Sequence, residues 1–120
     1  MRFLVLIHDE GDGSAGAPPA ALLDAIVEFR ADTTQGRWVD DGGLTPPADA
    51  VLVRSADGRA AVIDGPFAEA KEVVGGFFVV ESASPDAMAR WAKAFVDLHA
   101  EHWPALSFTA EVRQIVDPLS

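Results

Sequence analysis

His8 ends an apolar run, Phe3 to Ile7, and is followed directly by the carboxylates of Asp9 and Glu10. A histidine beside carboxylates at the end of a central strand is suited to general-base chemistry, because its ordinary pKa lies near neutrality. The same placement is also typical of a partly buried polar residue that simply closes a strand. We therefore take His8 as a candidate catalytic residue and leave the structural alternative open.

The segment DGPFAEAKE, residues 64–72, gathers several charged side chains behind a Gly-Pro turn. Asp64 precedes the turn, where its oxygens can accept hydrogen bonds from backbone N–H groups or, as a catalytic residue, take a proton. Lys71 and Glu69 stand two residues apart and do not share a helix face, so they are not a simple ion pair. We expect Lys71 and Glu69 at the rim of a ligand cavity, where Lys71 would offer a cation to an anionic ligand and Asp64 or Glu69 would accept a proton. A purely structural turn is the alternative.

The last strand alternates, so that Glu111 and Arg113 share one face and Ala110 and Val112 share the other. If the alanine and the valine face the helices, Glu111 and Arg113 point to the opposite side of the sheet. An arginine enclosed there needs a carboxylate or an anionic ligand as a partner. Both roles are open: a structural Arg–Glu pair, or ligand binding by Glu111 and Arg113.

His99 and His102 lie three residues apart near the end of a predicted helix and can face the same side. Two histidines do not complete a zinc site, which takes three or four protein ligands. Histidines also suit the negative end of a helix dipole. We expect neither a metal nor a cofactor.

These residues need a framework of strands and helices to position them, and hydrophobic periodicity predicts one. The pattern is typical of an α+β fold with an antiparallel sheet, two helices on one face and a ferredoxin-like β-α-β-β-β-α-β order that includes a hairpin around ADG. The expected strands lie at 2–9, 50–55, 59–64, 76–82 and 108–116, with a further short strand within 37–47 before a Gly/Pro break, and the expected helices lie at 18–36 and 84–103.

Two of these strands, FLVLI and GFFVV, are apolar on both faces instead of alternating. An antiparallel sheet with one wet face would alternate. Because the chain has no further helix to cover the second face, we expect a homodimer in which two sheets pack together.

The combination of GLTPP, DGPFAEAKE, GGFFVVE and EVRQ resembles the DGPF-domain branch of the YCII-related proteins over nearly the whole chain. The resemblance implies a dimeric α+β barrel. Some YCII-type relatives, including a dehydrochlorinase of aromatic breakdown, use a His–Asp pair whose histidine lies in the first helix. The first helix here, ALLDAIVEFRADTTQ, has no histidine, so that mechanism does not carry over. Genes of this branch often lie beside those of extracytoplasmic-function sigma factors, which implies a sigma-factor partner.

Composition narrows the class of function. A chain of 120 residues fits one domain, residues 1–120, and a net charge of −10 with nine Lys and Arg argues against nucleic acid as a partner. The absence of cysteine excludes thiol catalysis, and the N-terminal apolar run is too short for a signal peptide or a membrane span, so we expect a cytoplasmic protein. Two functions remain: a small-molecule-binding dimeric barrel with a polar cavity and lyase- or isomerase-like chemistry, or a non-enzymatic regulatory or binding module.

Overall fold

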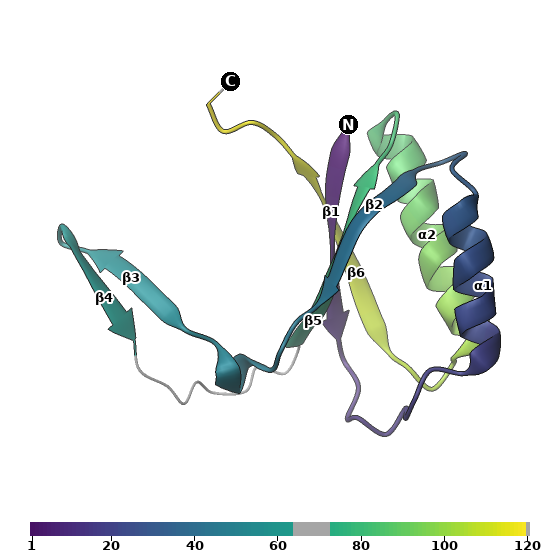
Figure 1. Cartoon of the computed structure of the whole chain (residues 1–120), viewed down its shortest axis with the longest axis horizontal. Coiled ribbons are helices and arrows are strands. Elements are labelled where there is room, and N and C mark those ends of the chain that lie inside the picture. The colour runs from purple at the N-terminus through teal and green to yellow at the C-terminus, as the bar shows by residue number, and fades with distance from the viewer. Residues whose placement is uncertain (64–72, 120) are drawn as a thin grey trace.

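The computed structural model describes residues 1–63 and 73–119 of the chain. Four strands form one antiparallel sheet in the order β2-β5-β1-β6, and both α-helices cover the same face of it (Figure 1). This is the arrangement of a ferredoxin-like fold, so the expected α+β class is confirmed. The sheet strands are β1 (Arg2–Asp9), β2 (Arg37–Gly43), β5 (Val73–Glu81) and β6 (Phe108–Ile115), and the helices are α1 (Ala20–Ala31) and α2 (Pro85–His102).

The predicted hairpin forms, but it is a sheet of its own. Strands β3 (Leu52–Ala56) and β4 (Arg59–Ile63) pair only with each other and stand away from the helices and the main sheet (Figure 1). Asp57 and Gly58 make the two-residue turn, and both have positive φ angles, 55° and 76°. After β2, Pro46 and a short 3-10 turn (Pro47–Asp49) interrupt the chain, since proline has no N–H to extend the ladder.

The helix ends follow local side-chain chemistry. Ser84 caps α2, and its hydroxyl accepts a 3.0 Å hydrogen bond from the Ala87 N–H. Helix α1 stops before the predicted limit of residue 36, because the Asp32 carboxylate binds the Thr34 N–H at 3.0 Å and forms a local turn. Neither described helix is long and apolar enough to cross a membrane.

The core lies between the helices and one face of the sheet. On β1, Phe3 and Val5 are buried against Met88, Trp91 and Phe95 of α2. Strand alternation turns Leu4, Leu6 and His8 to the opposite face, which no described helix covers. The sheet therefore has a helix-covered face and an open face, and each carries a group of polar side chains.

Candidate functional site

A β-bulge in β2 places two polar side chains of that strand on the helix-covered face of the sheet. Trp38 pairs with Val80 of β5, but the next paired residue is Asp40, opposite Val79, so Val39 is the extra residue. Without the bulge, residues 38 and 41 would point to opposite faces of the strand. With it, Trp38 and Asp41 both face the helices.

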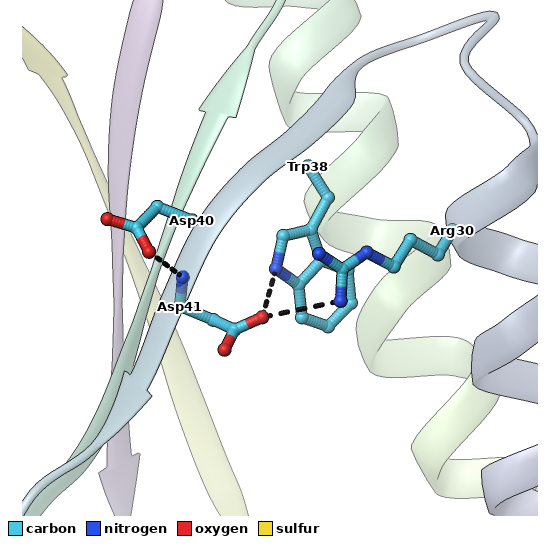
Figure 2. Close-up of polar contacts among 4 residues, drawn as sticks. All are labelled: Arg30, Trp38, Asp40 and Asp41. Atoms are coloured by element: carbon cyan, nitrogen blue, oxygen red, sulfur yellow. Dashed lines mark hydrogen bonds and ion pairs between the residues drawn. The ribbon is translucent and has the colours of Figure 1, made fainter.

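Asp41 links the strand to the end of α1. Its Oδ2 accepts a 2.9 Å hydrogen bond from Trp38 Nε1 and lies 3.5 Å from Arg30 Nη1. The Arg30 guanidinium sits 4.9 Å from the centre of the Trp38 ring, which is cation–π geometry. Figure 2 shows these three side chains together between β2 and the helices, while Asp40 lies on the other side of the strand.

This cluster stands at the mouth of a cavity of about 520 Å³ between the sheet and α1. Its interior is apolar, and the charged side chains among its described lining residues are Asp9, Arg30 and Asp41. One arginine against two aspartates gives this described wall a formal charge of −1. An apolar interior with a few polar groups at the mouth is the usual build of a small-molecule site. The apolar lining residues are Ile7, Ile26, Phe78, Leu106 and Phe108.

A smaller cavity of about 90 Å³ adjoins this one and reaches His99 on α2. Ile7, Phe78, Leu106 and Phe108 line both cavities, so the two lie side by side. Burial lowers the pKa of His99 below its usual 6.5, although a hydrogen bond to the Phe95 carbonyl opposes the shift. His99 is therefore mostly neutral at pH 7.

The open face brings together two of the residues predicted from the sequence. His8 Nε2 donates a 2.8 Å hydrogen bond to Glu111 Oε1, from β1 to the neighbouring β6. Ala110 and Val112 pack against the core, so the predicted orientation of Glu111 is confirmed. The two carboxylates that follow His8 in the sequence bind other groups. Asp9 accepts a hydrogen bond from the Gly11 N–H, and Glu10 accepts one from the Thr109 hydroxyl.

Arg113 is exposed on β6, and no carboxylate among the described residues of the single chain forms an ion pair with it. Glu111 pairs with His8 within the chain, and an Arg–Glu pair across a dimer stays a prediction. Asp64, Glu69 and Lys71 lie outside the described residues. The structure leaves their predicted roles untested.

The two histidines of α2 do not share a site. His99 points its Nδ1 to the Phe95 carbonyl, at 2.8 Å, whereas His102 Nε2 lies 4.0 Å from Glu101 Oε2. Within residues 1–63 and 73–119 no group of three His, Cys, Asp or Glu side chains is placed to hold a metal ion.

Sequence reasoning missed Arg30, Trp38 and Asp41 as a group. A tryptophan and an aspartate three apart in a strand belong to opposite faces unless a bulge intervenes, and the pattern WVDDGG gives no clear sign of one. The pair of glycines that follows is a weak signal, because glycine often marks irregular strands. At Gly42 an added Cβ would lie 2.7 Å from the Phe77 ring, so the strand needs glycine there.

The fold and the site define a ferredoxin-like α+β protein with a ligand-sized cavity between its sheet and its helices. The family model of the YCII-related domain matches residues 1–103, and the chain belongs to that family. It is also similar to an uncharacterized protein of Rhizobium meliloti (strain 1021), with 40% identity over 99 residues that cover 78% of each chain. The family resemblance drawn from the sequence motifs is confirmed.

Proposed function

We propose that this protein binds a small amphipathic molecule, neutral or cationic, in the cavity between the sheet and α1. The observation that carries this proposal is the combination of an apolar interior with the Arg30–Asp41–Trp38 mouth. A ligand would bury its apolar part against Phe78 and Phe108 and keep its polar end near Asp41.

The net charge of the side chains at the cavity mouth favours a cationic ligand over an anionic one. Arg30 already has Asp41 and the Trp38 ring as partners, while Asp9 adds a second negative charge to the described wall. A cationic ligand end gains from this field and an anionic end loses, although solvent weakens both effects at an open mouth.

Two probes of equal length test the proposal: 3-phenylpropylamine and 3-phenylpropionate, titrated into the protein by calorimetry at low salt. We expect the amine to bind about five-fold more tightly, the ratio that roughly 1 kcal/mol produces. Tighter binding of the acid would overturn the charge argument. If Lys71→Ala then removed the preference for the acid, Lys71 would be the anion contact that the sequence predicts.

Asp41→Asn tests whether the preference for the amine arises at the mouth of the cavity. The variant removes one negative charge and keeps an oxygen that can accept the hydrogen bond from Trp38. The preference for the amine should shrink in this variant. Asp24→Asn is the matched control, since Asp24 is exposed on α1 and does not line the cavity. An equal loss of preference in both variants would mean that net charge, and not the site, selects the probe.

We also propose that the protein is a homodimer in which the open faces of two sheets pack together. Leu4, Leu6 and Phe77 remain partly exposed in the single chain, and Val53 and Val62 of the hairpin are 66% and 65% exposed. A two-stranded hairpin is marginal alone in water, so contact with a second copy would stabilise it. Analytical ultracentrifugation at micromolar concentration should give twice the chain mass, and a folded monomer would contradict the dimer.

A second function is supported by the His8–Glu111 hydrogen bond. A carboxylate that orients a histidine is the usual arrangement of a general base, and a partner sheet would exclude water from it. In that case the dimer would carry a proton-transfer site of lyase or isomerase type on the open face. Co-purification of a sigma factor with a dimer inert in proton exchange would favour the regulatory alternative.

A further inference from the structure

His99 is a polar residue in an otherwise apolar position. Its ring centre lies 4.4 Å from that of Phe95 and 5.2 Å from that of Phe108. It lines the 90 Å³ cavity together with Ile7, Phe78 and Leu106, and it is the only polar side chain among the described residues of that wall. An apolar side chain would serve packing equally well, so the imidazole needs another explanation.

The hydrogen bond of His99 determines which nitrogen carries the proton. A carbonyl oxygen only accepts, so the 2.8 Å contact with the Phe95 carbonyl requires a proton on Nδ1. In the neutral ring Nε2 is then a bare acceptor, and no described residue donates a hydrogen bond to it. The burial that keeps the ring neutral maintains this acceptor at pH 7.

His99 is half-buried, and no side-chain nitrogen or oxygen of the described residues is both buried and unpaired, so Nε2 is accessible from the pocket and can accept from water or from a ligand. The other residues of that wall are apolar, so a water on Nε2 finds few further polar partners there, whereas an ordered water makes two to four hydrogen bonds. Four lining residues of this smaller cavity also line the larger cavity, so the two spaces adjoin. A molecule bound against these shared residues would therefore lie close to His99.

We propose that His99 is the recognition residue at the inner end of the cavity and that its Nε2 accepts a hydrogen bond from a ligand hydroxyl or N–H. The inference rests on the proposed binding function and names the ligand class more closely: a compact, ring-sized apolar group that carries a donor, such as a phenol. Phe78, Phe95 and Phe108 supply the aromatic walls for such a ring. The charged groups on the adjoining mouth are Asp9, Arg30 and Asp41, and none of them lines the inner cavity.

Phenol and toluene are suitable probes, because they have the same shape and only phenol has a donor. Binding of each is measured at pH 7.5 with the full chain, and the nitrogen signals of the histidine rings are followed by NMR. We expect phenol to bind about 2- to 10-fold more tightly than toluene, the range that one neutral hydrogen bond gives. We also expect phenol, and not toluene, to shift the Nε2 signal of His99.

His99→Phe keeps an aromatic ring and removes the acceptor, so it should bind phenol and toluene equally. His102→Gln is the control, because His102 lies one turn further along α2 and does not line the cavity. Toluene binding with no preference for phenol in the parent, or with the preference retained in His99→Phe, would overturn the role of His99 and keep the cavity proposal. Absence of binding by both probes would overturn both proposals.

Discussion

On the helix-covered face of the sheet, Phe3 and Val5 are 3% and 0% exposed, whereas Leu4 and Leu6, their neighbours in the same strand, remain partly exposed on the open face. The polar groups differ in the same way. The Arg30–Asp41–Trp38 group stands at the mouth of an open cavity formed within a single chain, while the His8–Glu111 pair lies on a surface without a described cover. One chain therefore covers one face of its sheet, and the other face is open to the second copy that we propose.

The largest expected effect belongs to the helix-covered face. Phe95 is 2% exposed and packs on Trp91 and Phe78, so Phe95→Ala should lower the free energy of unfolding by about 3–5 kcal/mol. Urea unfolding measures the change. Val27→Ala, at a site on α1 that is 70% exposed, is the control and should stay within about 0.5 kcal/mol. A loss of less than about 1 kcal/mol in Phe95→Ala would mean that this face is not the core.

The second prediction tests whether the open face is covered. If two sheets pack together, Leu6→Ala removes a buried side chain and should cost about 2 kcal/mol and weaken the dimer. Sedimentation at several concentrations and urea unfolding measure the two effects. Val27→Ala, at a site on α1 that is 70% exposed, should change neither. A fully stable Leu6→Ala protein with unchanged mass would remove the main support for sheet-on-sheet packing.

The third prediction compares the polar groups of the two faces. The His8 and Glu111 side chains are 20% and 42% exposed, against 52% and 41% for Arg30 and Asp41. Glu111→Gln should therefore lower stability by about 1 kcal/mol and Asp41→Asn by less, because more exposed ion pairs contribute little. Thermal melting of both variants at one pH measures the order. A reversed order would show that the cluster on the helix-covered face is the more structural of the two.

The smallest expected effect is the pH dependence that His99 imposes. Its pKa is lowered in the folded state, so well above pH 6.5 the His99 ring is neutral in both the folded and the unfolded state and does not make stability depend on pH. As the pH falls below 6.5, the unfolded state takes up the proton first, and the free energy of unfolding decreases until the native pKa is passed. In His99→Phe, the free energy of unfolding measured with urea should depend less on pH below 6.5 than in the parent. An equal pH dependence in the two proteins would contradict a lowered pKa of His99.

Several features of this protein follow from its sequence because they depend on neighbours in the chain. The Ser84 cap, the turn at Asp57 and Gly58, and the shared face of Leu4, Leu6 and His8 each arise within a few residues. Strand alternation likewise predicts that Glu111 turns away from the helices, and the motifs identify the YCII-related family.

Other features exist only once distant segments meet. The bulge at Val39 arises where β2 pairs with β5, and it turns Asp41 toward Arg30 of α1. The choice of Glu111 as the partner of His8, in place of the adjacent Asp9 or Glu10, depends on the register of β1 against β6. His99 acquires its apolar surroundings from β1, β5 and β6 as well as from its own helix. Sequence periodicity decides which face a side chain takes, but bulges, register and packing between distant elements decide which side chains meet.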